Sequence, residues 1–301
     1  MASPTLPAVS LAAVPGRRRR TLELAQEIER RGFAGIYCPS FGDGVGLCEA
    51  LALTTERIPF GTGIANIYMR HVSDYAQSAS LIQELSGGRF HFGVGVSHQP
   101  VNQRAGLQAG PPLGDMRDFI EQLGSVPRVG ELPPVVVAAL RKRMVALAGE
   151  LGGGVIFANA ARSHMPESLA ALPDRAQGED FFIGNMIPTC ISDDVEAAAA
   201  VNRRTLTGYV ALPNYRNYWK EAGYVEEMEA VEKALAAGER ERVPQVLSDR
   251  WLADTTLFGN ASTVLEGLEA WYEAGVRTPI LVPSSAAGNQ MKAFEELFDL
   301  F

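Results

Sequence analysis

The feature of this sequence that most constrains its fold is a regular alternation of short apolar runs with helical patterns along almost the whole chain. Most of the runs are continuously apolar, which is typical of parallel strands that are buried on both faces of a sheet. The segments between them repeat apolar residues at helical spacing. The predicted strands lie at residues 7–14, 35–39, 58–67, 89–96, 135–140, 154–157, 181–191 and 279–283.

Eight strands that alternate with helices predict a (β/α)8 TIM barrel, because eight is the strand number that closes such a sheet. An open doubly wound sheet needs a glycine-rich phosphate turn after its first strand, and this chain has Pro15-Gly16-Arg17 there. Helical patterns are predicted at residues 18–31, 45–54, 72–85, 113–123, 143–151, 166–172 and 290–301.

The segment 192–278 departs from the simple alternation. It holds helical patterns at 193–207, 225–237 and 263–274, an aromatic-rich stretch at 209–224, and no convincing strand. No linker-like composition flanks it. We therefore expect a helical insertion between strands 7 and 8 within a single domain of residues 1–301.

Composition excludes several function classes. The net charge of −8 disfavours nucleic acid as a partner, and the basic run at 17–20 is interpreted as the solvated start of a helix. No apolar stretch approaches ~20 residues, so no membrane span is expected, and the first residues lack the order of a signal peptide. The cysteines and histidines show neither paired nor metal-site spacing, which predicts a reducing cytoplasmic setting and no metal.

The segment 57–100 is the most informative part of the chain for function. Gly61 and Gly63 inside its first predicted strand indicate a bulge or a close backbone approach. Because the carboxyl ends of parallel strands share the ligand-binding edge, residues just after each strand are site candidates. They are Ser40 and Phe41, Asn66 and Tyr68, Ser97 and His98, Arg141, Lys142 and Arg143, and Asn159, Arg162 and His164.

Several of these patterns leave alternatives open. Gly93-Val94-Gly95 lacks the third glycine of a dinucleotide fingerprint, and small residues where barrel strands crowd explain it better. The cations at 141–143 predict either an anion site at a helix start or a solvated basic turn. His98 is a proton donor, a stacking partner for a planar ligand, or an ordinary loop histidine.

One long stretch carries a family resemblance. TTERIPFGTGIANIYMRHVSDYAQSASLIQELSGGRFHFGVGVSH resembles the central region of the bacterial luciferase-like monooxygenase superfamily. PPLGDMRDFIEQL, PPVVVAALRKRMVALAGELGGGV and LTGYVALPNYRNYWKEAGY resemble its branch that uses the deazaflavin coenzyme F-420. The resemblance implies a coenzyme F-420-dependent oxidoreductase that transfers a hydride to or from an organic substrate.

The resemblance also implies roles for particular residues. A non-prolyl cis peptide at Gly63–Ile64 would back the deazaflavin ring. Departures from the family pattern at Ser40-Phe41, His98 and Arg141-Lys142 leave the sugar-phosphate type of substrate unsupported and make His98 the best acid/base candidate, with Asn66 as a hydrogen-bond donor to the ring. The expected cofactor-binding residues are Ser40, Gly63, Ile64, Asn66, Val96, Ser97, Leu140, Arg141 and Met144.

Two other functions stay open. One is an FMN-dependent luciferase-like monooxygenase. The other is a barrel without catalysis that binds a flavin-like ligand or only a partner chain. The resemblance further implies a homodimer formed through helices near the start of the chain. The substrate is expected to be a small organic molecule whose identity no pattern in the sequence reveals.

Overall fold

The computed structural model describes residues 6–176 and 178–301, so the part of the predicted single domain at residues 1–5 lies outside the described residues. Parallel strands and helices alternate in the order of a (β/α)8 barrel, which confirms the predicted fold class. The strands are β1 Ala8–Ser10, β2 Ile36–Pro39, β3 Phe60–Gly63, β4 Ala65–Asn66, β5 Phe90–Gly95, β6 Val135–Ala138, β7 Gly154–Ala158, β8 Phe182–Ile191, β9 Leu257–Gly259 and β10 Thr278–Ser284.

Most of the helices lie on predicted segments, but those at residues 99–104 and 249–255 were not predicted. They are α1 Arg18–Arg31, α2 Gly44–Thr54, α3 Val72–Ser86, α4 Gln99–Arg104, α5 Pro112–Ser125, α6 Lys142–Leu151, α7 Met165–Leu169, α8 Val195–Val210, α9 Pro213–Glu221, α10 Val225–Ala236, α11 Asp249–Thr255, α12 Ala261–Glu273 and α13 Gln290–Leu300. Short 3₁₀ turns lie at η1 Arg162–His164, η2 Asp174–Ala176 and η3 Arg240–Val246. Among the described residues, no helix is long and apolar enough to cross a membrane.

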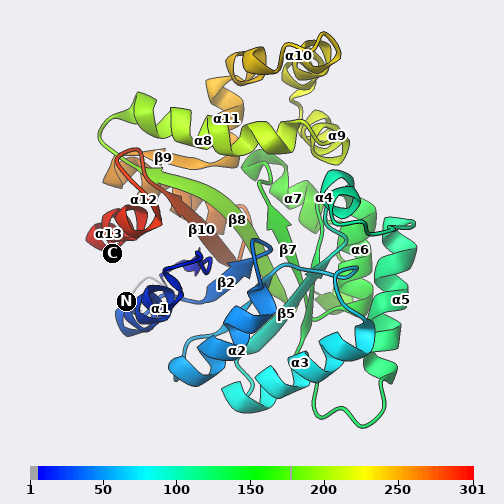
Figure 1. Ribbon diagram of the computed structural model, residues 1–301. Helices are drawn as coiled ribbons and strands as arrows, with labels where there is room; N and C mark the ends of the chain where they lie inside the picture. Colours follow the sequence, from blue (N-terminus) through cyan, green and yellow to red (C-terminus); the bar gives the residue numbers. More distant parts are fainter. Residues whose placement is uncertain (1–5, 177) are drawn as a thin grey trace. The chain divides into compact units, whose positions relative to one another are not determined.

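The chain divides into two compact units. The first runs to Phe157 and includes Ala170–Gly184, and the second comprises Ala158–Leu169 and Asn185–Phe301. In the first unit β1, β2, β3, β5, β6 and β7 are parallel neighbours in that order, and β4 also pairs with β5. Helices α2, α3, α5 and α6 lie outside these strands, and each contacts the next along the chain (Figure 1). The expectation of a single domain stays a prediction.

The second unit holds the segment that departs from the alternation. Residues 192–278 form α8 to α12 and η3, together with the short strand β9, which pairs in parallel with β8. The expectation of no strand there is therefore wrong. Three residues are too few to show a period, so only the pairing with β8 makes β9 recognisable. All three tryptophans of the chain, Trp219, Trp251 and Trp271, are fully buried in this unit.

Glycines in the first unit allow the strands to approach closely. A Cβ built at Gly93 would overlap the carbonyl oxygen of Thr62, and one at Gly61 would overlap that of His91. The hydroxyl of Thr62 donates a hydrogen bond to the Gly93 carbonyl at 2.6 Å. The interpretation of the 93–95 glycines as a response to strand crowding, and of Gly61 as a site of close approach, is thus confirmed.

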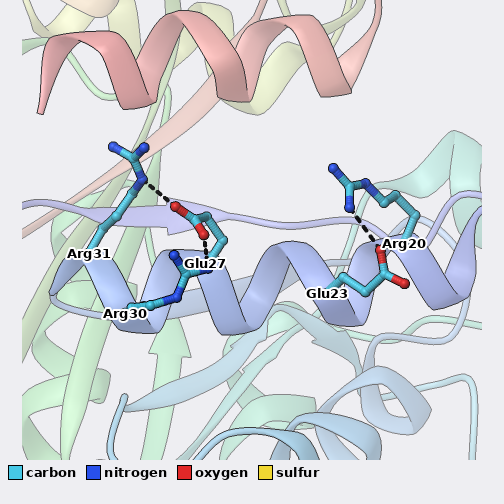
Figure 2. Close-up of polar contacts among 5 residues, drawn as sticks. All are labelled: Arg20, Glu23, Glu27, Arg30 and Arg31. Atoms are coloured by element: carbon cyan, nitrogen blue, oxygen red, sulfur yellow. Dashed lines mark hydrogen bonds and ion pairs between the residues drawn. The ribbon is translucent and has the colours of Figure 1, made fainter.

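The basic run at the start of α1 belongs to a solvated helix face. Figure 2 shows Arg20 paired with Glu23, and Glu27 paired with both Arg30 and Arg31, one turn apart on the same helix. Pairs at this spacing neutralise each other along an exposed helix surface. The interpretation of residues 17–20 as a solvated helix start is confirmed.

Candidate functional site

Four neighbouring strand ends of the first unit carry the predicted cofactor residues at one edge of the sheet. In the parallel register Pro39 pairs with Gly63, Asn66 with Gly95, and Val94 with Val137. The residues just beyond these pairs are Ser40, Ile64, Val96, Ser97, His98, Leu140, Arg141 and Met144. The structure therefore gathers the predicted set on the edge where barrels bind ligands, and its role toward a cofactor stays a prediction.

The backbone between β3 and β4 has the feature that the resemblance implies. The Gly63–Ile64 peptide bond is cis, which confirms that expectation. The strand predicted at 58–67 is in fact two short strands, each pairing with β5. A Cβ built at Gly95 would meet the Ile64 side chain at 3.0 Å. Glycine at position 95 thus leaves Ile64 its place beside β5.

Asn66 is the centre of a buried hydrogen-bond chain. Its Oδ1 accepts from the backbone N–H of Tyr68 at 3.2 Å, and its Nδ2 donates to Oδ1 of Asn102 at 2.8 Å. The Nδ2 of Asn102 in turn donates to the backbone carbonyl of Val96 at 3.0 Å. Both asparagines are buried. These bonds join the end of β4 to the segment after β5.

Tyrosine hydroxyls brace the same edge. Tyr75 donates to the backbone carbonyl of Asn66 at 2.7 Å, and Tyr68 donates to Oδ2 of Asp115 at 2.6 Å. The same carboxylate oxygen accepts the backbone N–H of Gly110 at 2.7 Å, so Asp115 also holds the loop before α5. Burial and then the bond to Asp115 raise the pKa of Tyr68, which keeps its hydroxyl a donor at physiological pH.

Ser97 and His98 lie where β5 gives way to α4. Ser97 has a φ of 56°, in the left-handed region, and His98 is the N-cap residue of α4. The His98 carbonyl accepts the N–H groups of Val101 and Asn102. His98 is half-buried, and this burial lowers the pKa of its imidazole. The ring is therefore neutral at physiological pH and has one donor and one acceptor nitrogen.

The end of β6 supplies apolar and cationic side chains in succession. Leu140 and Met144 are half-buried, whereas Arg141, Lys142 and Arg143 are exposed around the first turn of α6. Arg141 is the N-cap residue of this helix and makes no side-chain cap bond. Exposed cations beside the start of a helix favour an anion at this end.

The end of β2 is exposed to solvent. Ser40 is exposed, and the side chain of Phe41 beside it is 72% exposed. Two residues later Asp43 caps α2 and binds Arg70, which lies after β4, at 2.9 Å. This ion pair ties the loop after β2 to the loop after β4.

In the second unit, the residues after β7 are fixed by aromatic side chains. Asn159 has a φ of 55° and is buried. Its carbonyl accepts the indole N–H of Trp219 at 3.2 Å, and the hydroxyl of Tyr218 accepts the N–H of Ala161 at 3.1 Å. His164 is buried against the ring of Tyr218, which favours a packing role.

A buried carboxylate completes this support. Asp254 accepts the backbone N–H and the hydroxyl of Ser163 at 2.9 and 2.6 Å, and the hydroxyl of Tyr224 at 2.8 Å. Burial and the bond to Asp254 raise the pKa of Tyr224 to about 12. No group of three or more histidine, cysteine or acidic side chains within residues 6–176 and 178–301 is placed to hold a metal ion.

Sequence reasoning missed Asn102 and Asp115. Both act through α4 and α5, and α4 is absent from the predicted helices because residues 99–104 contain a single apolar pair, Pro100 and Val101, without a helical period. Proline in the first turn of a helix is a start signal, and Pro100 occupies that turn. That signal could have located α4, but nothing in the sequence pairs Asn102 with Asn66.

Polar, partly buried groups lie at the carboxyl ends of the parallel strands, the place where (β/α)8-barrel enzymes bind their ligands. The model of one family, the luciferase-like monooxygenases, matches residues 3–126 and 121–278. The chain therefore belongs to the luciferase-like monooxygenase family and is an enzyme.

Individual relatives are more distant. A Mycobacterium tuberculosis protein, named provisionally as a coenzyme F-420-dependent oxidoreductase, is 24% identical over 281 residues, which cover 77% of this chain and 81% of that protein. The coenzyme F-420-dependent tetrahydromethanopterin reductase from Methanopyrus kandleri superposes with a TM-score of 0.77 at 17% identity, covering 97% of each chain.

A second solved structure represents the flavin-using side of the fold. The oxygenating constituent of 3,6-diketocamphane monooxygenase from Pseudomonas putida, a type II Baeyer-Villiger monooxygenase in complex with FMN, gives a TM-score of 0.58 at 16% identity, with 92% of each chain covered. At sequence identities of 16–17%, these structural similarities show the fold and nothing more about this chain.

Proposed function

We propose that this enzyme is a coenzyme F-420-dependent oxidoreductase that transfers a hydride between the deazaflavin and a small organic substrate. The observation that carries the proposal is the edge formed by β3, β4 and β5, where Asn66, Val96, Ser97 and His98 are held by one hydrogen-bond chain. The name of the mycobacterial relative supports the choice of cofactor.

The chemistry of this edge fits a planar, partly apolar ring. Ile64, Val96, Leu140 and Met144 are half-buried apolar side chains from three strand ends, and they are available to cover ring faces. Beside them Ser97 adds a hydroxyl and a left-handed backbone. The exposed cations Arg141, Lys142 and Arg143 fit a phosphate-bearing tail.

When bound, the deazaflavin would supply the two-electron chemistry. The residues of this chain would bind and orient it and manage the proton. His98, neutral through burial, would hold a proton at Nδ1 or Nε2 and exchange it with a substrate oxygen. Asn66 would act as a hydrogen-bond donor toward the ring, while its Oδ1 stays engaged with Tyr68.

The second candidate is an FMN-dependent monooxygenase of the same family. The family's own activity and the FMN complex of the Pseudomonas putida neighbour favour it. A third reading is a barrel without catalysis that binds a flavin-like ligand or only a partner chain, because Ser40 and Phe41 stand where related deazaflavin dehydrogenases often have an Asp-His pair.

Parallel titrations with F-420 and FMN, followed by cofactor fluorescence, test the choice. We expect F-420 to bind at micromolar or lower concentration and at least tenfold more tightly than FMN. Tighter binding of FMN would replace the proposal with the monooxygenase. Failure of both to bind would favour the non-catalytic reading.

A His98→Ala variant tests the proton role. We expect hydride transfer from reduced F-420 to any accepted ketone or aldehyde in a screening panel to fall roughly a hundredfold or more, with F-420 affinity unchanged. His71→Ala is the matched control, because His71 is exposed and caps α3. Equal rates in the wild type and His98→Ala would remove this assignment.

We propose further that two copies pair through α2 and α3. These helices contact each other, and Leu53, Leu81 and Leu85 on them are large apolar side chains exposed to solvent. Light scattering on a Leu53→Glu, Leu81→Glu variant is expected to show a monomer where the wild type is a dimer. The buried free cysteines accord with the proposed cytoplasmic location.

A further inference from the structure

Asn102 is the buried residue of a short helix whose other residues are exposed to solvent. Helix α4 has six residues, and Asn102 is the one among them with its side chain buried, at 3% exposure. An apolar face does not hold this helix on the sheet. Both ends of the Asn102 amide are instead used for hydrogen bonds, to Asn66 and to the carbonyl of Val96.

The orientation of the two amides is fixed by backbone groups at each end of the chain of bonds. The N–H of Tyr68 can only donate, so it faces Oδ1 of Asn66, and Asn66 Nδ2 must point to Asn102. The carbonyl of Val96 can only accept, so it faces Nδ2 of Asn102. Each bond enforces the polarity of the next.

Asn102 also fixes the backbone on both sides of itself. Its N–H donates to the carbonyl of His98 at 3.0 Å, and its carbonyl accepts the N–H of Leu107 at 2.9 Å. One residue therefore restrains Val96 through its side chain and His98 through its main chain. Ser97 lies between these two points with its left-handed φ of 56°.

We propose that Asn102 is a positioning residue, which sets the geometry of the segment Val96–His98 and of Asn66 for the bound deazaflavin. This inference rests on the proposed function for its consequence, because the segment it orders is the one assigned there to the cofactor and to proton exchange. Asn102 itself acts through these neighbours.

The Asn102→Asp substitution keeps the acceptor of the side chain and removes its donor, so it tests the bond to Val96 separately from the bond from Asn66. The introduced carboxylate still accepts from Asn66, but it sets a second acceptor against the carbonyl of Val96. At pH 7.5 we expect F-420 affinity to fall roughly tenfold to a hundredfold, the size of effect when a buried acceptor loses its donor. As the carboxyl becomes protonated in acid, it regains a donor, so the ratio of affinities to wild type at the same pH should recover.

Asn202 offers a matched control in the second unit. It is fully buried on α8, and its Nδ2 donates to the carbonyl of Leu257 at 3.0 Å. Asn202→Asp therefore creates the same conflict of acceptors, in the unit that contains none of the candidate cofactor residues. We expect it to lower the melting temperature while F-420 affinity per folded molecule stays within twofold of wild type.

A second readout needs no cofactor. The imidazole of His98 can be titrated by NMR in the cofactor-free protein, with His98→Ala used to assign its signal. Burial lowers the pKa of His98 in the wild type. We expect this pKa to rise in Asn102→Asp, because the segment loosens and a negative charge lies nearby, and to stay unchanged in Asn202→Asp.

The outcomes separate the two proposals. If wild type does not bind F-420, the proposed function fails, and the His98 titration alone decides whether Asn102 positions its segment. If wild type binds F-420, an Asn102→Asp variant with wild-type affinity and an unmoved His98 titration overturns the inference. Equal losses in Asn102→Asp and Asn202→Asp, without recovery in acid, would reduce Asn102 to a purely structural residue.

Discussion

The two ends of β3 and β5 in the first unit are built with different chemistry. At the amino end, the carboxylate of Glu29 accepts the backbone N–H groups of Glu56, Arg57 and Ile58 at 2.7–3.1 Å. At the carboxyl end, neutral asparagine amides link Asn66 to the segment after β5.

The guanidinium of Arg89 completes the amino end. It donates to the carbonyls of Ala52, Thr55, Ile58 and Ser86 and to the Thr55 hydroxyl, at 2.8–3.2 Å. Every one of these charged groups is used up on the protein's own backbone and side chains. At the carboxyl end, the backbone beside Ser97 and His98 is held by neutral amides.

This difference indicates that the amino end stabilises the fold and that the carboxyl end binds the ligand. Barrels place stability at the amino ends of their strands and ligands at the carboxyl ends. The charged groups at the amino end stabilise turns, and we expect them to take no part in ligand binding. Neutral amides at the carboxyl end give order without imposing a charge on a ligand. Variants at each end test this division.

The largest expected effect is that of Arg89→Met. Several partly buried carbonyls would lose their donors at once, so we expect the free energy of unfolding to fall by roughly 3–5 kcal/mol. Urea denaturation followed by circular dichroism measures the loss, and F-420 affinity per folded molecule should not change. Arg117→Met is the control, because Arg117 binds Glu150 on the exposed surface of α5 and α6, and it should alter stability little. A change in F-420 affinity in Arg89→Met would contradict the assignment of stability to the amino end and ligand binding to the carboxyl end.

Glu29→Gln is expected to have a smaller and pH-dependent effect. Burial raises the pKa of Glu29, but the N–H donors of Arg57, Ile58 and Glu56 with the nearby charge of Arg89 outweigh it, so the net pKa is lowered. A depressed folded-state pKa stabilises the fold above the unfolded value of about 4.3, and this contribution is lost as the pH falls through the folded pKa.

The free energy of unfolding of the wild type should therefore exceed that of Glu29→Gln by about 1–2 kcal/mol between pH 5 and 7. The difference should shrink as the pH falls below about 4. Urea denaturation at a series of pH values measures it. A gap between the two proteins that does not change with pH would show that the carboxylate charge at this turn is unimportant.

The smallest expected effect is that of Tyr68→Phe at the carboxyl end. Asp115 would keep its bond to the Gly110 N–H, so stability should fall by no more than about 1 kcal/mol. F-420 affinity is expected to weaken a few-fold, because the loop before α5 is held less firmly. Tyr37→Phe is the comparison: its hydroxyl contacts His91 at 3.0 Å inside the first unit, and it should leave F-420 affinity unchanged. Weaker F-420 affinity in Tyr37→Phe than in Tyr68→Phe would contradict the assignment of ligand binding to the carboxyl end.

Local patterns were enough to predict most of the strands and helices and the edge on which the candidate residues meet. They did not predict β9, α4 or α11, because a three-residue strand and helices of six and seven residues are too short to show a period. They also did not predict the contacts of Glu29 and Asn102. Glu29 binds backbone 27 to 29 residues further on, and Asn102 lies 36 residues from Asn66. Such pairs are created by tertiary packing and leave no local signal.

The three buried tryptophans give the molecule an uneven optical reporter. Trp219, Trp251 and Trp271 all belong to the second unit, so intrinsic tryptophan emission follows the unfolding of that unit. The first unit, with Glu29, Arg89 and the candidate site, has no tryptophan among its described residues. If the two units melt at different temperatures, emission alone would record one transition and pass over the other. A single tryptophan introduced at the exposed Phe41 would make the silent half of the chain visible.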